Sequence, residues 1–583
     1  MLAILLSFTV ISFIFITFGD CIVYIYNKVC RKEERYSLLD TFLLGMVLSC
    51  ILLSISSLFL PSNHYVLSAY ILLCAGYWLI KRTQFRALLS RVKVLLTGIP
   101  KIFLLMILGA ILSYIAIAIW SPGVFDAFFY HQQNIRWNEE FSVVPGLANL
   151  EDRFGFNSNY LLLSALFSFR VLFGEAIYGL QATIVMWAVI WILYEISRSR
   201  FETKRILLLF SFMLFFFIQA YSMLTTTSTD IVPNIVIFCF FAKFILYPKS
   251  LQNSSLYAIL IPITLVTLKI SVAPVLIISI FVLCHILKNK DYKSFMALAI
   301  LSILTISPWL IRNVIISGYL LYPAHNIDLF AFDWKLPKEV AILQHGFVRD
   351  CGTVAVQGIV NSFSDIRTFM QPHTFLSNLV YIIILLSPIS FINAIRKQKK
   401  EKTATILVYC TLIAIIAVWA INAPDPRFVS GVLYISACFA ICLLLPTTRD
   451  LRLKPLFGQS IVFLFALVLT VWGIKRSYNF YADFGSKNTY EHKRQITDAL
   501  IKPYSYKTQL TGAGIDTNAH KEYLLNNGIT IYLSESEAGG RPVCFDCLPC
   551  TVEDTNWTSK YQDIKTIEAR GSSLQDGFRP KTR

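Results

Sequence analysis

The chain has 583 residues, of which 56% are hydrophobic and only 15% are charged, whereas charged residues make up about 25% of a typical soluble domain. Such a composition cannot cover the surface of a soluble protein with polar groups. The net charge of +17 does not indicate nucleic-acid binding, because the basic residues lie in short connectors between apolar blocks and form no basic stripe with interleaved aromatic residues.

The apolar residues come in blocks of about 17 to 25, the length that lets a helix cross roughly 30 Å of hydrocarbon. The sequence therefore predicts an all-α polytopic membrane protein with about 14 transmembrane helices. The expected spans lie near residues 2–26, 38–60, 65–81, 102–120, 176–197, 205–223, 230–247, 255–268, 271–288, 294–315, 375–395, 403–421, 427–446 and 457–474. They divide the chain into a module of about three spans in residues 1–101, a membrane core in 102–474, and a C-terminal segment in 475–583.

Positive charge alternates along the connectors. Every second connector is rich in Lys and Arg, for example residues 28–35 and 396–402, whereas residues 62–64 and 225–230 carry neither. The positive-inside rule places the basic connectors in the cytoplasm. The N-terminus, the long segments 121–175 and 316–374, and the C-terminal segment are then expected to be extracytoplasmic.

One apolar stretch, Tyr160–Phe173, is a test of this topology. At about 14 residues it is short for a crossing, and a crossing here would move every later basic connector to the outside. This length suits an interfacial or re-entrant helix, and we place the stretch on the outer membrane surface.

Ionisable residues concentrate in the first long loop. Asp126 lies just beyond the fourth span, where partial desolvation suits a carboxylate that acts as a general base. The alternative is that the loop residues only solvate a membrane surface. His131 could be a base or a metal ligand, although a lone His in an aromatic loop is more often structural. The other candidate binding residues of this loop are Arg136, Glu139, Glu140, Asn149, Arg153 and Asn157.

Further polar residues lie at the expected outer ends of later spans. Asp230 begins the seventh span and could be a helix N-cap or part of a site. Lys269 could snorkel toward water or meet a phosphate as a point charge. Arg312, which precedes Asn313, and Arg427 could anchor an aromatic belt or bind a phosphate through paired hydrogen bonds.

In their order and shared side, these residues resemble the GT-C superfamily of membrane glycosyltransferases. The resemblance rests on Asp126, Asp230, Lys269 and the stretch Pro308–Asn313, and it covers most of residues 102–446. More narrowly, residues 125–157 and 544–578 resemble an uncharacterised family of bacterial multipass membrane proteins grouped with that superfamily. Many members of the superfamily carry an acidic pair in the first loop, whereas here Asp126 is followed by Ala127, and Glu139, Glu140 and Asp152 are the nearest other acids.

The resemblance implies a GT-C-like fold and an enzyme of the bacterial inner membrane. It would transfer a sugar from a polyprenyl phosphate or diphosphate to an extracytoplasmic acceptor, which would be a glycan, a glycolipid or a protein. Asp126 would deprotonate the acceptor for direct displacement, and Asp230 would orient acceptor or sugar. Lys269, Arg312 and Arg427 would hold the carrier phosphate and stabilise the leaving group. No cofactor is expected to be obligatory, and a divalent metal stays an open alternative.

After about residue 475 the sequence becomes polar, and alternating stretches such as Gly528–Leu533 predict a small α/β segment, with a further helix expected near residues 490–501. This segment is expected to lie against the outer loops. The resemblance implies a disulfide between Cys544 and Cys550, with Cys547 left over. A zinc site would need a fourth ligand, for which distant His520 is the only candidate.

Two other functions fit parts of the sequence. A transporter or flippase of lipid-linked sugar would show internal repeats and ionisable residues near the middle of the membrane, and Lys243 alone comes close to such a position. A non-catalytic component of a polysaccharide assembly system would leave the Asp126 loop without a role.

Overall fold

The computed structural model is mainly helical, with a small region of strands near its C-terminal end. It describes residues 1–119, 126–220, 224–397, 401–445, 452–485, 499–503, 507, 516, 519–535, 544, 547–552 and 561–581. The α-helices in these residues are α1 (Leu2–Cys30), α2 (Leu38–Ser56), α3 (His64–Ile80), α4 (Arg82–Gly98), α5 (Lys101–Ile119), α6 (Gln132–Glu140), α7 (Asn159–Leu166), α8 (Arg170–Phe173), α9 (Leu180–Arg198), α10 (Thr203–Phe215), α11 (Ile231–Leu246), α12 (Ser250–Asn253), α13 (Ser255–Leu268), α14 (Leu276–Lys288), α15 (Tyr292–Ser317), α16 (Lys338–Ser364), α17 (Ile366–Phe369), α18 (Pro372–Lys397), α19 (Lys402–Asn422), α20 (Ser430–Leu444) and α21 (Pro455–Gly485).

The helices are those of a multi-pass membrane protein. Within the described residues, 9 helices are long and apolar enough to cross a membrane, and four further apolar helices are shorter, at His64–Ile80, Leu104–Ile119, Ile231–Leu246 and Ser255–Leu268. The remaining predicted span coincides with α10 and its π-helical continuation Phe216–Ala220. Each predicted span therefore falls on a helix, while the exact number of crossings stays a prediction.

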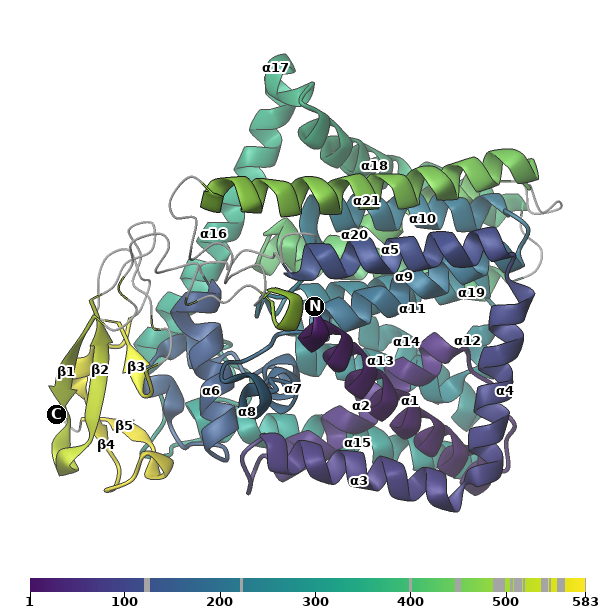
Figure 1. Ribbon diagram of the computed structural model, residues 1–583. Coiled ribbons are helices and arrows are strands. Elements are labelled where there is room, and N and C mark those ends of the chain that lie inside the picture. The colour runs from purple at the N-terminus through teal and green to yellow at the C-terminus, as the bar shows by residue number, and fades with distance from the viewer. Residues whose placement is uncertain are drawn as a thin grey trace.

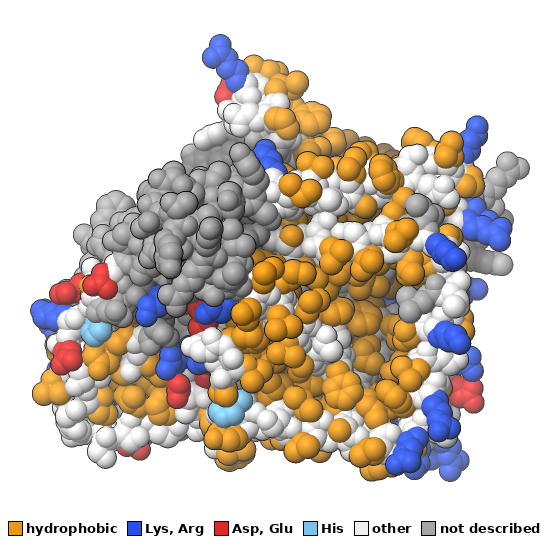
Figure 2. All heavy atoms as spheres, viewed as in Figure 1, with side chains coloured by type: hydrophobic (Ala, Val, Ile, Leu, Met, Phe, Trp, Pro, Cys, Tyr) orange, Lys and Arg blue, Asp and Glu red, His pale blue; other side chains and the backbone are white. Residues whose placement is uncertain are grey.

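Charge separates the two ends of these helices. Most of the long helices run roughly side by side, with α4 across one end and α6, α7 and the strands at the other (Figure 1). In Figure 2 a broad hydrophobic band covers the helices, and Lys and Arg side chains gather at the edge where α4 lies. This is the charge distribution that the positive-inside rule predicts, and we refer to this edge as the basic end.

The first two helices pack closely against each other and against the rest of the membrane core. The backbone of Gly45 lies against the carbonyl of Phe15, and that of Gly19 lies against the carbonyl of Thr41. Small residues allow such close approach of helix backbones in membranes. The pair also contacts α9, α13 and α15, so that residues from the predicted N-terminal module share one core with the later helices.

The apolar stretch Tyr160–Phe173 does not form one interfacial helix. Its first part is α7, an 8-residue helix about 12 Å long, which is too short to cross the membrane. Every residue of α7 is buried, and the helix packs against α2, α3, α6 and α13. Only α8, where Val171 and Leu172 are exposed, has the surface position that we predicted. The error arose because apolar composition does not distinguish burial in protein from contact with lipid.

The C-terminal segment contains two small sheets. In the first, β1 (His520–Leu524) pairs antiparallel with β2 (Thr530–Ser534), which pairs parallel with β3 (Cys550–Thr551), and in the second, β4 (Ile567–Ala569) pairs with β5 (Phe578–Pro580). Strand β2 confirms the strand expected near Gly528–Leu533. The helix expected near residues 490–501 lies mostly outside the described residues.

These strands pack against the first long loop, as predicted. The backbone nitrogen of Tyr561 donates to Oδ2 of Asp152 at 2.8 Å, and Oγ1 of Thr551 donates to the carbonyl of Leu150 at 3.1 Å. Asp152 is fully buried, and burial together with the neighbouring charge of Glu151 raises its pKa. Asp152 therefore serves to attach the tail to the loop.

Cys544 and Cys550 form the predicted disulfide, which leaves Cys547 outside it. Both half-cystines are buried against Phe129 of the first loop. With two of the three cysteines oxidised, the tail lacks the thiols that a zinc site would need.

We expect Cys544→Ser to lower the free energy of unfolding of the tail by about 2 kcal/mol, because the closed loop is short and the entropic gain of a disulfide grows with loop length. Limited proteolysis at rising temperature should detect earlier cleavage within the tail. Cys351→Ser, at an exposed thiol on α16, is the control and should cleave like the wild type. Equal cleavage of both variants would show that the disulfide does not stabilise this segment.

Candidate functional site

Asp126 stands at the start of a single π-helical turn, Ala127–His131, which continues into α6. Such turns are frequent at functional sites, because the extra residue displaces side chains from the regular helix surface. The Asp126 side chain is 35% exposed, and its Oδ2 lies 3.8 Å from Nη1 of Arg427. The carboxylate thus faces a residue that is 301 positions away in the sequence.

Arg427 is held in place by its neighbours at the start of α20. Oδ1 of Asp425 accepts a hydrogen bond from the backbone nitrogen of Arg427 at 2.9 Å, and Oδ2 pairs with its Nε, also at 2.9 Å. Nδ2 of Asn234 in α11 donates to the Arg427 carbonyl at 2.8 Å. The Arg427 side chain remains 44% exposed, so its position is fixed while part of it stays accessible.

Asp230 and Lys269 form an ion pair beside these residues. Asp230 occupies the N-cap position of α11, as one alternative predicted, but its side chain makes no cap hydrogen bond and pairs with Lys269 instead. Lys269, just after α13, also lies 4.0 Å from the centroid of the Phe428 ring, and its side chain is only 15% exposed. It therefore does not snorkel into water. Burial alone would raise the pKa of Asp230, but the charges of Lys269 and Arg427 outweigh burial, and the net shift is downward.

His131 is buried among these charged groups. It is 3% exposed, and neither ring nitrogen has a hydrogen-bond partner in the described part of the chain. Burial lowers the pKa of His131 to about 4, although the charges of Asp126 and Asp230 oppose this shift. The ring is therefore neutral near pH 7, with one nitrogen able to donate a hydrogen bond and the other able to accept one.

We call Asp126, His131, Asp230, Lys269 and Arg427 the Asp126 cluster. It joins four separate segments at the end of the helices that bears α6 and α7, opposite the basic end (Figure 1). Two carboxylates and two cations alternate in it. A partly exposed carboxylate next to fixed cations can take up a proton close to the position where an anion is bound.

Arg312 lies outside this cluster, contrary to our expectation of three cations around one phosphate. Its Nη1 donates to Oγ of Ser57 at 2.9 Å and its Nη2 to Oδ1 of Asn138 at 2.7 Å. The residue is only 2% exposed. The guanidinium therefore connects α15 to the end of α2 and to α6, and both of its terminal nitrogens donate within the protein.

Asn313 and Asn157 also have structural contacts. Nδ2 of Asn157 donates to Oδ1 of Asn313 at 2.9 Å, while Nε1 of Trp309 donates to the Asn157 carbonyl at 2.9 Å. Trp309 and Asn313 thus attach the end of the first loop to α15. The pattern that drew attention to these residues in the sequence reflects packing in this structure.

The remaining candidates of the first loop hold it together. Arg136 pairs with Glu140 at 3.1 Å on the surface of α6, and Glu139 pairs with Arg170 at 2.7 Å. Nδ2 of Asn149 donates to the Trp334 carbonyl at 2.8 Å. The second carboxylate of the candidate site is thus Asp230, and it does not come from the other acids of the first loop.

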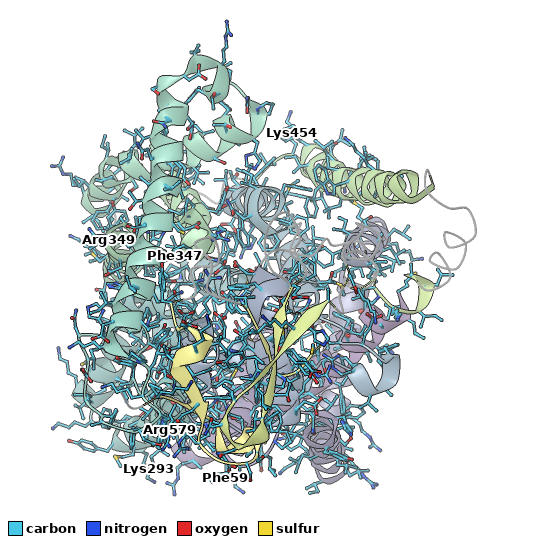
Figure 3. The ribbon with its side chains drawn as sticks, turned by 90° about the vertical axis from the view of Figure 1, so that its left-hand side faces the viewer. Phe59, Lys293, Phe347, Arg349, Lys454 and Arg579 are labelled. Atoms are coloured by element: carbon cyan, nitrogen blue, oxygen red, sulfur yellow. A yellow bond between two sulfur atoms is a disulfide. The ribbon has the colours of Figure 1, made fainter. Side chains whose placement is uncertain are left out.

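Arg153 lies beside the cluster and packs against aromatic rings. Its guanidinium lies 4.6 Å from the centroid of the Phe129 ring and 5.3 Å from that of Phe347 on α16, which is labelled in Figure 3. Its charge contributes to the low pKa of buried His131, after the effect of burial. Arg153 therefore joins the π-helical turn to α16.

Sequence reasoning missed Asp425 and Asn234 as residues that position Arg427. The signal for Asp425 was present in the stretch Pro424–Arg427, because an Asp before a tight turn commonly accepts the backbone hydrogen bond two residues later. Asn234 gave no signal, since its partner is 193 positions away.

We expect Arg312→Lys to lower the thermal midpoint of unfolding, because one ammonium cannot reproduce the two hydrogen bonds that the guanidinium makes to Ser57 and Asn138. The loss should be about 1–3 kcal/mol, which thermal unfolding in detergent can detect. The control is Arg349→Lys on the exposed surface of α16 (Figure 3), which should unfold like the wild type. A midpoint unchanged in Arg312→Lys would contradict this structural role.

Comparison with known proteins gives one match. The family model "Domain of unknown function (DUF8201)" matches residues 1–434. This region contains the whole Asp126 cluster and ends before the strands of the tail. No curated protein matches the chain, and no solved structure matches it.

Proposed function

Because the chain belongs to the DUF8201 family, whose function is unknown, we propose a function from the Asp126 cluster: a glycosyltransferase that moves a sugar from a polyprenyl phosphate or diphosphate to a cell-envelope acceptor. The main support for this proposal is that Asp126 faces Arg427 while Asp230 pairs with Lys269. The resemblance to GT-C glycosyltransferases assigned Asp126, Asp230, Lys269 and Arg312 to one site, with Arg427 as a further candidate, and four of these five residues lie together. Their convergence supports the proposal, because the residues lie far apart in the sequence.

Asp126 is the proposed catalytic base. It is the more exposed of the two cluster carboxylates, at 35% against 12% for Asp230, so an acceptor hydroxyl can reach it. Asp126 accepts the hydroxyl proton as the acceptor oxygen attacks the anomeric carbon. The bond between that carbon and the phosphate oxygen breaks in the same step, and the phosphate leaves with the electron pair.

Lys269 and Arg427 are the proposed phosphate ligands. Charge builds on the leaving phosphate as the glycosidic bond breaks, and fixed cations lower the energy of that transition state. In the unliganded protein their charges are balanced by Asp230, Asp126 and Asp425. Arg312 has no part in this scheme, because both of its terminal nitrogens donate to Ser57 and Asn138.

Deletion of the gene tests this proposal against transport. Loss of a transferase should remove a glycan from the cell envelope and leave its lipid-linked sugar on the outer face of the membrane, where an added lectin can bind it. Loss of a flippase would trap the same lipid on the inner face. Mass spectrometry of the glycans, together with lectin binding to intact cells, separates these outcomes. An unchanged glycan profile would refute both functions.

A further inference from the structure

A second site lies at the basic end of the helices, opposite the Asp126 cluster. It is an open cavity of about 1390 Å³, lined by the link between α1 and α2 and by parts of α4, α5, α9, α11 and α12. Both α4 and α12 lie at the end away from the strands (Figure 1). The volume exceeds the roughly 300–1,000 Å³ of ordinary small-molecule sites. The cavity therefore fits a ligand larger than a metabolite.

The wall of the cavity is mainly apolar and aromatic. It includes Leu104 and Ile107 from α5, and Trp187, Ile190 and Trp191 from α9. Helix α9 is long and apolar enough to cross a membrane, and Leu104–Ile119 of α5 is a shorter apolar helix. A surface of this kind binds hydrocarbon chains, because burying them removes apolar area from water.

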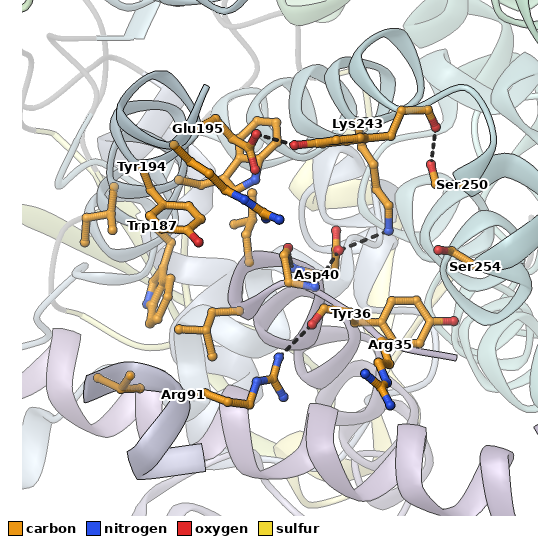
Figure 4. Close-up of a pocket in the computed structure, with 18 of the residues that line it drawn as sticks. Arg35, Tyr36, Asp40, Arg91, Trp187, Tyr194, Glu195, Lys243, Ser250 and Ser254 are labelled. Atoms are coloured by element: carbon orange, nitrogen blue, oxygen red, sulfur yellow. Dashed lines mark hydrogen bonds and ion pairs between the residues drawn. The ribbon is translucent and has the colours of Figure 1, made fainter. Parts of the chain in front are cut away.

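Two of the four acidic side chains that line the cavity form ion pairs with basic residues. Asp40 pairs with Lys243 at 3.0 Å (Figure 4), and Glu195 pairs with Arg205 at 3.1 Å. Glu34 accepts a hydrogen bond from the hydroxyl of Tyr36. The two ion pairs neutralise Asp40 and Glu195. Glu33 and Glu34 have no ion-pair partner among the described residues, but the four basic residues considered next outnumber them.

Four basic residues of the lining, in contrast, have no carboxylate partner in the described part of the chain and can bind an anionic ligand. Within the described chain no carboxylate pairs with Arg35, Arg91, Arg198 or Lys249, and all four residues are exposed. Arg91 donates one hydrogen bond at 2.9 Å to the carbonyl of Tyr36, which brings its guanidinium to the link that carries Arg35 (Figure 4). The hydrogen bond thus places the Arg91 guanidinium at the residue next to Arg35, and both residues line the same side of the cavity.

We propose that this cavity binds an anionic phospholipid, with its phosphate at Arg35 and Arg91 and its acyl chains along the wall formed by α5 and α9. Basic pockets between membrane helices select such headgroups, and Arg binds phosphate through paired hydrogen bonds. In the predicted topology this lipid comes from the cytoplasmic leaflet. The site is separate from the Asp126 cluster and does not depend on the proposed transferase activity.

Native mass spectrometry of the full-length protein in detergent tests the site with two added lipids. Dioleoyl-phosphatidylglycerol is anionic, and dioleoyl-phosphatidylcholine has the same chains with a zwitterionic headgroup. We expect the anionic lipid to bind about ten-fold more tightly, because the net charge that distinguishes the two headgroups is worth about a factor of ten. Arg35→Gln/Arg91→Gln should remove that preference. Ser90→Trp, at an exposed lining residue of α4, should weaken binding of both lipids by filling part of the cavity.

Arg86→Gln is the matched control, because Arg86 is an exposed Arg of the same helix that does not line the cavity. It should bind the anionic lipid like the wild type. Equal binding of the two lipids, or an equal loss in Arg86→Gln and in the double variant, would overturn the proposal in favour of diffuse surface attraction. Displacement of the lipid by inorganic phosphate alone would overturn it in favour of a simple anion site, and a co-purified polyprenyl phosphate would overturn the assigned lipid class.

Discussion

Asp126→Asn is expected to slow sugar transfer by a factor of about 10²–10⁴, because the amide cannot accept the proton that the acceptor hydroxyl must lose. The measurement is the single-turnover rate in proteoliposomes supplied with the lipid-linked sugar that accumulates in the deletion strain. The variant should fold normally, since the substituted side chain is 35% exposed and Arg427 keeps its bond to Asp425. Donor binding should change little, so that the loss falls on the rate and not on affinity.

Glu339→Gln provides the control for this prediction. Glu339 is an exposed carboxylate in the first turn of α16, and its loss should leave the transfer rate unchanged. If Asp126→Asn transferred sugar at a rate within about two-fold of the wild type, Asp126 could not be the general base. The same cluster could then serve to bind substrate only.

Lys269→Met is expected to destabilise the protein by about 3 kcal/mol, because it leaves the buried carboxylate of Asp230 without its ion-pair partner. Asp230 is 12% exposed in this pair. Thermal unfolding in detergent measures the loss. Lys338→Met is the matched control, since Lys338 is 51% exposed and lies 3.6 Å from Asp328, and exposed pairs contribute about 1 kcal/mol or less.

The double variant Asp230→Asn/Lys269→Met separates stability from function. Removing both charges should restore much of the lost stability, because no buried charge then stays unpaired. Sugar transfer should remain impaired, since the phosphate loses one of its two cations. A double variant that recovered transfer together with stability would show that the pair is purely structural.

The lowered pKa of Asp230 also predicts how the free energy of unfolding changes at acidic pH. Its pKa in the folded protein is depressed by Lys269 and Arg427, which together outweigh the opposing effect of burial. The ionised group therefore contributes stability above the unfolded-state pKa of about 3.9, and this contribution is lost as the pH falls through the folded-state pKa. The difference in unfolding free energy between the wild type and Asp230→Asn should accordingly shrink below about pH 4.

The sequence by itself determined the membrane helices and the uneven distribution of charge between their two ends. Both are local properties. A block of apolar residues leaves water whatever the rest of the chain does, and the Lys and Arg residues next to a span set the orientation of that span in the membrane. It also predicted the strand near Gly528–Leu533, and the resemblance implied the disulfide of the tail. Helix α4 and the long helix α16 were not foreseen, because their mixed polarity gives no span signal.

Only the tertiary structure decided which polar residues share a site. Asp126, Asp230, Lys269 and Arg427 all stood at expected outer helix ends, as did Arg312, and the sequence could not tell them apart. The first four converge because their segments pack together across as many as 301 positions, whereas Arg312 is used by Ser57 and Asn138. The choice of an ion-pair or hydrogen-bond partner depends on distances of a few ångströms between remote segments, and the local sequence does not contain those distances.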